Sequence, residues 1–407
     1  MNIQLNKSTL NKKSAINITG SKSESNRMLL LQALYPNIEI DNLSNSDDTK
    51  VMLEALSTSS RNIDIHHAGT AMRFLTAYFA TQSGRDVVLT GSDRMKQRPI
   101  KILVDALKNL GAEITYLESE GFPPLKITGK SLTKNKVTLK ANISSQYISA
   151  LLLIAPKLEN GLELTLEGEI TSIPYINMTL SLLNQIGVNT NFHNNVIKVN
   201  QQSEIVNQQS LIESDWSSAS YFYSMVALSD VGTEITLSSY KQNSLQGDSI
   251  LAKIYQDFGV ETSFQNNSVS LSKVKFCSQN RLNYQLNNSP DIAQTIAITC
   301  FALGLECQLT GLHTLKIKET DRLLALKTEI EKLGGEVSIT EDSLFLKAFK
   351  FINPQVNIDT YNDHRMAMAF APLALVTSIG INDAEVVSKS YPTFWEDLKG
   401  IGFQVSK

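Results

Sequence analysis

The chain has 407 residues, of which 42% are hydrophobic and 19% are charged, and its formal net charge is −3. Two domains are expected at this length, and the weakly acidic balance argues against a general binder of polyanions. The longest apolar runs are too short to cross a bilayer, and no signal-peptide-like segment begins the chain, so we expect a cytoplasmic protein. Its three cysteines form no CxxC pair, so we expect buried thiols and no disulfide framework or cysteine-based zinc site.

A helix that ends at a glycine and leads into a strand recurs along the chain. Apolar residues at helical spacing precede each glycine and alternating residues follow it, which is typical of a left-handed residue that closes a helix. A sixth copy, at residues 51–65, keeps the helix pattern but lacks the glycine, and the segment that follows the helix is short. We therefore predict six α/β units of about seventy residues, grouped three and three, with the first one shortened. The glycines are Gly111, Gly187, Gly259, Gly334 and Gly402.

Small polar residues and cations collect where further helices are expected to begin. Serine, threonine, asparagine and aspartate are ordinary helix caps, and each segment alone is best explained as a cap. Lysines and arginines accompany most of the segments, and helix N-termini bind anions. We therefore predict a site for a small, multiply charged anion. The segments are SKSESNR at 21–27, AGTAMR at 68–73, SSQ at 144–146, SPD at 289–291 and NDHR at 362–365.

The motif KETDR at 318–322 allows two interpretations. The first is a solvated first helical turn in which Lys318 and Arg322 face each other at i,i+4, and this is favoured for the motif in isolation. In the second, both cations hold an anion and Glu319 carries a proton. Asp291 would then be a second carboxylate in a different setting, as in sites that separate an acid from a base.

The stretch YNDHRMAMAFAP at 361–372 combines a polar start with small apolar residues. We predict that Asn362 or Asp363 caps a helix here. Pro372 would remove a hydrogen bond inside that helix, so we predict a kink that spares the first turn. No P-loop, GxGxxG, HExxH or GxSxG motif is present, which argues against nucleotide, metal or serine-hydrolase chemistry of those types.

Taken together, the motifs make the chain similar to the 5-enolpyruvylshikimate-3-phosphate synthase (3-phosphoshikimate 1-carboxyvinyltransferase) family. The resemblance runs through essentially the whole chain, and eleven motifs in family order are highly specific. They are SKSESNR, AGTAMR, DRMKQRPI, SSQYISALL, TSIPYI, DWSSASYF, NSLQGD, PDIAQTIA, KETDR, YNDHRMAM and SKSYPTFW.

The resemblance implies an α/β enolpyruvyl transferase fold of two lobes. Each lobe would hold three βαβαββ units in an inside-out, barrel-like arrangement, with the first unit truncated. Residues 20–213 would form the first lobe, on the shikimate 3-phosphate side, and residues 1–19 plus 214–407 the second. The active site would lie in the cleft between the lobes.

The implied reaction transfers the enolpyruvyl group of phosphoenolpyruvate to the 5-hydroxyl of shikimate 3-phosphate, in the pathway to chorismate and aromatic amino acids. The resemblance implies a monomer that needs no cofactor or metal and binds neither nucleic acid nor membrane. Asp291 would accept the hydroxyl proton and Glu319 would donate a proton, with Lys22 and His364 beside them.

The substrate ligands follow from the same resemblance, position by position. For shikimate 3-phosphate they are Lys22, Ser23, Arg27, Ser144, Ser145, Gln146, Ser172, Tyr175, Asp291, Thr314 and Lys318. For phosphoenolpyruvate they are Lys22, Gly69, Arg98, Gln146, Arg322, Arg365 and Lys389.

Several positions depart from the family pattern. His67 precedes AGTAMR where the family usually has asparagine, and Phe74 follows it where the family has proline. Thr314 replaces a substrate-contacting asparagine, and the segment between Asp48 and Ala68 is shorter than usual.

Three alternative functions fit the sequence less well. UDP-N-acetylglucosamine enolpyruvyl transferases share the fold and donor, but many carry a cysteine in the first lobe, whereas all three cysteines here lie beyond residue 276. RNA 3′-terminal phosphate cyclases use related units, but no basic nucleic-acid face is visible. A non-catalytic anion-binding descendant would keep the cations and lose an acid or base, yet Asp291 and Glu319 are both present.

Overall fold

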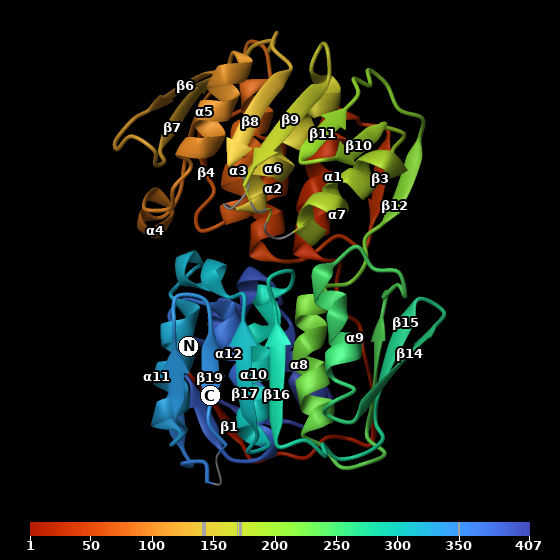
Figure 1. Ribbon diagram of the computed structural model, residues 1–407, viewed down its shortest axis with the longest axis vertical. Helices are drawn as coiled ribbons and strands as arrows, with labels where there is room; N and C mark the ends of the chain where they lie inside the picture. Colours follow the sequence, from red (N-terminus) through yellow and green to blue (C-terminus); the bar gives the residue numbers. More distant parts are fainter. Residues whose placement is uncertain (141–143, 169, 171–172, 349–350) are drawn as a thin grey trace. The chain divides into compact units, whose positions relative to one another are not determined.

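The computed structural model describes residues 1–407 except 141–143, 169, 171–172 and 349–350. It divides into two compact units, which are unit 1 (Met1–Thr19 and Glu213–Lys407) and unit 2 (Gly20–Ile212) (Figure 1). These boundaries differ by one residue from the predicted lobes, and the predicted cleft between the lobes stays a prediction. Within the described ranges, the helices are all too short or too polar to cross a membrane.

Unit 1 contains three four-stranded sheets of the same construction. In each sheet one pair of neighbouring strands is parallel, and the other two pairs are antiparallel. The orders are β14-β15-β13-β2, β16-β17-β19-β18 and β20-β21-β1-β22. Strand β1 comes from the N-terminus and completes the third sheet. The first sheet contains β2 (Lys13–Ile16), β13 (Glu234–Ser238), β14 (Val260–Gln265) and β15 (Ser268–Lys273). The second contains β16 (Arg281–Gln285), β17 (Glu306–Thr310), β18 (Val337–Ile339) and β19 (Leu344–Leu346), and the third contains β20 (Val356–Ile358), β21 (Ile379–Ile381), β1 (Ile3–Asn6) and β22 (Gln404–Ser406).

The helices of unit 1 join these strands. The α-helices are α8 (Trp216–Ala227), α9 (Leu251–Ile254), α10 (Ala293–Ala302), α11 (Arg322–Lys332), α12 (His364–Phe370) and α13 (Phe394–Gly400). The 3₁₀ turns are η2 (Gly247–Ile250), η3 (Pro290–Ile292), η4 (His313–Ile317), η5 (Ala371–Leu375) and η6 (Ala384–Lys389).

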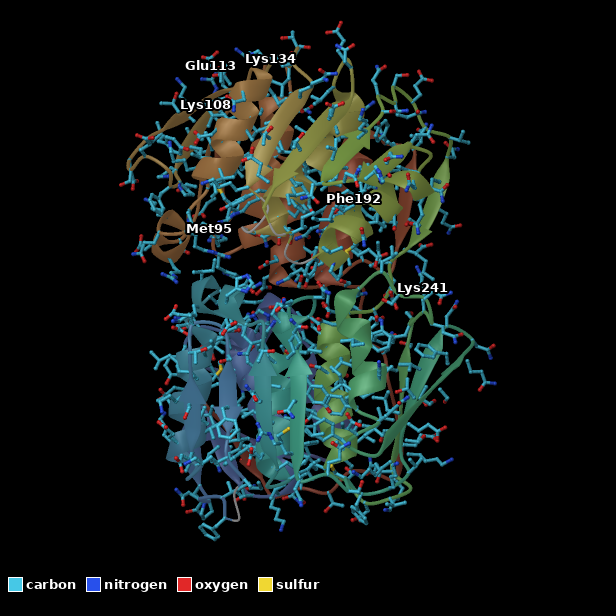
Figure 2. All side chains as sticks on the ribbon, in the orientation of Figure 1. Met95, Lys108, Glu113, Lys134, Phe192 and Lys241 are labelled. Carbon is cyan, nitrogen blue, oxygen red and sulfur yellow. The ribbon has the colours of Figure 1, made fainter. Side chains whose placement is uncertain are left out.

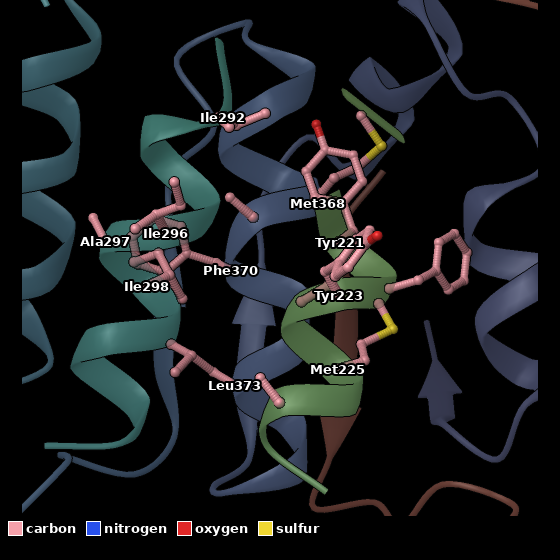
Figure 3. Close-up of a cluster of buried hydrophobic side chains, with 14 of the residues drawn as sticks. Tyr221, Tyr223, Met225, Ile292, Ile296, Ala297, Ile298, Met368, Phe370 and Leu373 are labelled. Atoms are coloured by element: carbon pink, nitrogen blue, oxygen red, sulfur yellow. The ribbon is translucent and has the colours of Figure 1, made fainter. Parts of the chain in front are cut away.

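Three helices, α8, α10 and α12, supply much of the core of unit 1. Figure 3 shows Tyr221 on α8, Ile296 on α10 and Phe370 on α12 among the apolar side chains that pack there, and all three are buried. A helix that is apolar nearly all round is typical of a buried position, and α10 fits this description. The small residues of α12, Ala367 and Ala369, are buried in the same core.

Unit 2 repeats the same plan with one shortened member. Among its described residues, two sheets have four strands, in the orders β4-β5-β7-β6 and β10-β11-β9-β8, while the third contains only β12 and β3. The predicted truncation is therefore confirmed. The strands are β3 (Ile38–Asp41), β4 (Asn62–Asp64), β5 (Asp86–Thr90), β6 (Glu113–Tyr116), β7 (Leu125–Thr128), β8 (Lys136–Lys140), β9 (Leu162–Glu167), β10 (Thr190–His193), β11 (Val196–Val199) and β12 (Gln208–Leu211). The helices are α1 (Lys22–Leu34), α2 (Asp47–Ser57), α3 (Gly69–Ala80), α4 (Asp93–Lys96), α5 (Lys101–Leu110), α6 (Ser145–Ile154), η1 (Ala155–Lys157) and α7 (Ile173–Gln185).

The glycine signal read from the sequence marks four of the five helix ends. Gly111, Gly187, Gly334 and Gly402 lie within two residues of the ends of α5, α7, α11 and α13, whereas α9 already ends at Ile254, before Gly259. All five glycines have positive φ, from +77° at Gly259 to +117° at Gly402, a conformation that is open to glycine without the steric penalty of a Cβ atom.

Some predicted helix starts are wrong. The segments SKSESNR and AGTAMR do not precede their helices, because α1 already begins at Lys22 and α3 at Gly69. Helix α11 begins at Arg322, and Asp321 caps it by accepting from the backbone N–H groups of Leu323 and Leu324. Lys318 and Glu319 therefore lie before the helix, and the interpretation of KETDR as a first helical turn fails.

The predicted cap at residues 362–363 is confirmed, whereas the helix ends before Pro372 and does not kink within its length. Asp363 caps α12, and its side chain accepts from the backbone N–H of Arg365 at 2.9 Å. The α-helix does not run unbroken through Pro372, because it ends at Phe370 and the chain continues as the 3₁₀ turn η5.

Candidate active site

In unit 1, cations from two helices and a loop converge on the carboxylate of Asp291, which lies in η3 just before α10. The Nη1 of Arg322 is 2.8 Å from its Oδ1, and the Nζ of Lys318 is 3.5 Å from the same oxygen. The Nη2 of Arg365 is 3.4 Å from Oδ2, and its Nη1 donates to the backbone carbonyl of Asp291 at 3.1 Å. Residues far apart in sequence thus form one compact polar cluster.

The charges around Asp291 control its ionisation. Burial on its own would raise the pKa of this carboxyl, but the positive charges of Lys318, Arg365 and Arg322 outweigh burial and hold the pKa well below its usual value. Asp291 is therefore ionised in the free protein.

Arg322 binds the second predicted proton carrier as well. Its Nη2 donates to Oε2 of Glu319 at 2.8 Å, and its Nε donates to Oδ2 of Asp363 at 2.6 Å. The guanidinium is only 2% exposed, and burial would lower its pKa, but Asp363, Glu319 and Asp291 together raise it. One buried cation therefore contacts both Asp291, which is 11% exposed, and Glu319, which is 25% exposed.

Sequence reasoning missed two residues of this cluster, Ser217 and Asp248. The Nη2 of Arg365 donates to the hydroxyl of Ser217 at 3.2 Å, and that hydroxyl donates to Oδ2 of Asp248. Burial, and then the nearby charge of Asp291, raises the pKa of Asp248 to about 7. Asp248 belongs to the motif NSLQGD, so an acid inside a family motif was the signal that could have identified it.

The remaining predicted residues of unit 1 are Lys389, His364 and Thr314. The Nζ of Lys389 donates to the backbone carbonyl of Asn362 at 2.6 Å. The Nδ1 of His364 is 3.8 Å from Oδ1 of Asp363. The Oγ1 of Thr314 is buried and has no hydrogen-bond partner within the described ranges, as expected for an atom whose partner is a ligand.

In unit 2, Lys22 and His67 share one carboxylate. The Nζ of Lys22, at the start of α1, is 3.4 Å from Oδ2 of Asp48 on α2. The Nε2 of His67 is 3.6 Å from Oδ1 of the same residue, which is buried. The histidine that departs from the family pattern therefore contacts the partner of a predicted catalytic lysine.

Arg27 is held by neutral groups inside unit 2. It donates to Oγ1 of Thr179 at 2.8 Å and to the hydroxyl of Ser149 at 2.9 Å, and it also donates to the backbone carbonyls of Ser23 and Tyr175. Burial lowers the pKa of Arg27 to about 10. Among the described residues, these four bonds use four of the five N–H donors of the guanidinium.

The substitution of phenylalanine at position 74 has a structural explanation. The Cζ of Arg27 lies 5.4 Å from the ring centroid of Phe74 and 5.9 Å from that of Tyr175. Cations are attracted to aromatic faces at such distances. Phe74 therefore helps to hold a predicted substrate ligand.

The start of α3 holds Arg98 in place. A Cβ atom added at Gly69 would lie 2.5 Å from Nη1 of Arg98, so the guanidinium packs directly against the glycine. Nearby, the Nε2 of Gln146 donates to Oγ1 of Thr70 at 3.2 Å. The structure thus places Gly69, Arg98 and Gln146 around the starts of α3 and α6.

Two more predicted ligands of unit 2 lie at the start of α6, and one cannot be described. Ser144 caps α6 by accepting from the backbone N–H of Gln146, and Ser145 is the first, buried residue of the helix. Ser172 lies outside the described residues.

Other charged residues of unit 2 lie on the surface and away from these positions. Lys108, Glu113 and Lys134, near the C-terminal end of α5, are exposed (Figure 2).

Solved structures define the class of fold. An EPSP synthase from Acinetobacter baumannii superposes with a TM-score of 0.81 and 21% sequence identity, covering 100% of both chains. The enolpyruvyl transferase NikO from Streptomyces tendae superposes with a TM-score of 0.76 and 13% identity, covering 100% of this chain and 98% of its own. The fold is therefore that of the enolpyruvyl transferases.

Sequence comparisons define the family within that class. The model of the family EPSP synthase (3-phosphoshikimate 1-carboxyvinyltransferase) matches residues 56–398. A 3-phosphoshikimate 1-carboxyvinyltransferase of Bacteroides fragilis (strain YCH46) is 46% identical over 97% of this chain and 96% of its own. One of Haemophilus influenzae (strain PittGG) is 37% identical over 95% of this chain and 96% of its own. The chain belongs to the EPSP synthase family.

Proposed function

We propose that this protein transfers the enolpyruvyl group of phosphoenolpyruvate to the 5-hydroxyl of shikimate 3-phosphate and releases phosphate. Family membership supports this reaction. The observation that carries it is the contact of one buried arginine, Arg322, with both Asp291 and Glu319. Two carboxylates in different settings suit a reaction that removes one proton and adds another.

In the proposed mechanism the oxygen of the 5-hydroxyl attacks C2 of phosphoenolpyruvate. Asp291 accepts the hydroxyl proton and Glu319 donates a proton to C3, so that the double bond is replaced by a tetrahedral intermediate. Phosphate then leaves from C2, and one proton of the new methyl group returns to the carboxylate of Glu319, which restores the double bond. The nearby cations stabilise the charge on the departing phosphate.

Asp291 has a low pKa in the free protein, whereas a proton acceptor needs a higher one. Its role as the base therefore requires that bound substrates raise its pKa. A carboxylate held so far below its usual pKa is a weak base. Binding of anions beside Lys318, Arg322 and Arg365 adds negative charge near Asp291, and like charges raise a carboxyl pKa. Substrate binding therefore turns Asp291 into a stronger base at the moment when a base is needed.

The ligand sets inferred from the family resemblance draw on both units, and this part of the proposal stays a prediction. Monomeric state, cytoplasmic location and independence of metals and cofactors also stay predictions. Binding of phosphoenolpyruvate through several guanidinium groups is consistent with its carboxylate and phosphate, which arginine forks bind in bidentate fashion.

The test is phosphate release from phosphoenolpyruvate with different acceptors. We expect release with shikimate 3-phosphate and none above background with UDP-N-acetylglucosamine. Release with only the sugar nucleotide would replace this proposal with the alternative enolpyruvyl transferase reaction. Binding of the substrates without release would indicate a non-catalytic descendant.

A further inference from the structure

Helix α11 carries a buried carboxylate, Glu329, that the proposed mechanism does not use. It lies two turns after Arg322 on the same helix and has 0% exposed surface. Its Oε1 accepts from the hydroxyl of Tyr361 at 2.5 Å, and its Oε2 accepts from the backbone N–H of Asp359 at 3.2 Å and from Nζ of Lys332 at 2.8 Å. A buried carboxylate needs such partners, so these bonds fix its position.

The turn that Glu329 holds has an unfavourable backbone conformation. Tyr361 has φ +54° and Asn362 has φ +56°, both in the left-handed region, and neither is glycine. Non-glycine residues keep this conformation only where the surrounding structure holds them, and such strain collects at functional sites. The bond from Tyr361 to Glu329 supplies part of that restraint from a helix outside the turn.

The strained turn leads directly into the cluster around Asp291. The carbonyl of Asn362 accepts from Nζ of Lys389, and the next residue, Asp363, pairs with Arg322 and caps α12. Two residues later Arg365 contacts Asp291. The turn therefore sets the positions of the predicted phosphoenolpyruvate ligands Lys389 and Arg365.

We propose that Glu329 and Tyr361 are positioning residues for the phosphoenolpyruvate ligands, acting through the turn at 361–362. The inference rests on the proposed function, because it concerns how that site holds its donor substrate. Glu329 also accepts a hydrogen bond from the backbone N–H of Asp359, just after β20, and that bond would be enough if Glu329 only stabilised the fold. The bond from Tyr361 is an additional one. Tyr361 is 37% exposed, so Tyr361 itself contributes little to the core.

The variant Tyr361→Phe removes the hydroxyl and keeps the ring. We expect its KM for phosphoenolpyruvate to rise about tenfold, the effect of losing one hydrogen bond to a charged group, while its KM for shikimate 3-phosphate stays within about twofold. Steady-state kinetics with each substrate varied in turn measures both values.

Tyr284→Phe is the matched control. The hydroxyl of Tyr284 donates to Oδ2 of Asp257 at 2.8 Å, which is also a tyrosine–carboxylate bond in unit 1 but does not involve the turn. We expect the control to lose a comparable amount of thermal stability with both KM values unchanged. Wild-type KM for phosphoenolpyruvate in Tyr361→Phe, or an equal rise in the control, would overturn the inference.

A double variant separates this inference from the proposed function. If Tyr361 acts through Lys389, the effects of the two substitutions are not additive. Adding Tyr361→Phe to Lys389→Ala should then raise KM for phosphoenolpyruvate by less than about twofold relative to Lys389→Ala alone. Full additivity would contradict the route through Lys389. No turnover by the wild-type protein would refute the proposed function and this inference together, whereas wild-type turnover with unchanged variants refutes the inference alone.

Discussion

The two units hold their buried arginines in different ways. In unit 1, Arg322 contacts Asp291, Glu319 and Asp363, and its pKa is raised because these charges outweigh burial. In unit 2, Arg27 donates to hydroxyl and carbonyl oxygens, and burial lowers its pKa to about 10. Unit 1 therefore balances its cations with its own acids.

Arg73 shows that the pattern in unit 2 is not confined to one residue. It donates to the carbonyls of Gly69 and Pro99, and burial, followed by the charge of Arg98, lowers its pKa to about 10. Buried arginines whose hydrogen bonds go to neutral acceptors favour an added anionic ligand, although Glu24 also acts on Arg27. On this basis we propose that unit 2 mainly binds shikimate 3-phosphate and that unit 1 carries the groups that transfer protons.

The largest expected effect is on kcat, and it tests the proton-transfer role assigned to unit 1. Asp291→Asn and Glu319→Gln should each lower kcat by about 10²–10⁴-fold, because each removes a general acid or base. Both variants keep every cation, so both substrates should still bind. Turnover assays combined with equilibrium binding measure the two properties, and near-normal kcat in either variant would refute the role assigned to that residue.

The next largest effect is on KM for shikimate 3-phosphate, and it tests the anion-binding role assigned to unit 2. Arg27→Lys keeps a positive charge but cannot reproduce the planar fork that reaches Thr179, Ser149 and two carbonyls. We expect KM for shikimate 3-phosphate to rise by about 10- to 100-fold, as for the loss of one or two charge-assisted bonds. Arg73→Lys is the control, and an equal rise in that variant would show that the effect is only a loss of packing.

A smaller effect should follow from Gly69→Ala. The new Cβ would lie 2.5 Å from Nη1 of Arg98, a distance that forces the guanidinium to move. We expect KM for phosphoenolpyruvate to rise about tenfold, while Gly400→Ala should leave it unchanged because a Cβ there meets nothing within 4 Å. Kinetics of both variants with phosphoenolpyruvate varied would show whether Arg98 is a ligand, and unchanged KM in Gly69→Ala would argue that it is not.

The smallest effect is on the pH dependence of stability. Because the folded protein raises the pKa of Asp248 to about 7, protonated Asp248 stabilises the fold below its unfolded pKa of about 4, and this contribution is lost as the pH rises through 7. A tenfold change in the ionisation constant of a carboxyl on folding corresponds to about 1.4 kcal/mol. Asp248→Asn cannot ionise, so urea unfolding should show a smaller fall in stability between pH 4 and 7 than in the wild type.

Asp230→Asn serves as the control for that measurement. Asp230 is exposed, with 80% of its side-chain surface accessible, and it pairs with the exposed Lys12. We expect this variant to keep the wild-type pH dependence. A parallel profile for Asp248→Asn and the wild type would show that Asp248 does not titrate in this range.

Local features were the most predictable part of the fold. The positive φ values at glycines such as Gly111 and Gly402, and the cap by Asp363, depend on residues next to each other in the chain. Helix starts were less predictable, because polar residues such as those of SKSESNR suit both a cap and a first turn. In the structure, α1 begins at Lys22, inside this segment.

The sequence itself indicated an anion site and candidate acid and base residues, whereas the assignment of individual ligands came from the family resemblance. Asp291, Arg322 and Arg365 lie on separate elements, and no periodicity or spacing brings them together. Asp248 and Ser217 were missed because their role depends on burial and on contact with Arg365. The pairing of Glu329 with Tyr361 is equally non-local, since it joins a helix to the turn before another helix.

The most direct test of the division between the units is titration of shikimate 3-phosphate into Asp291→Asn and Arg27→Lys, with kcat measured for both. We predict near-wild-type Kd and a large loss of kcat for Asp291→Asn. For Arg27→Lys we predict a Kd raised by about 10-fold or more and a much smaller loss of kcat at saturation. The reverse pattern, with binding lost in Asp291→Asn and retained in Arg27→Lys, would contradict this division.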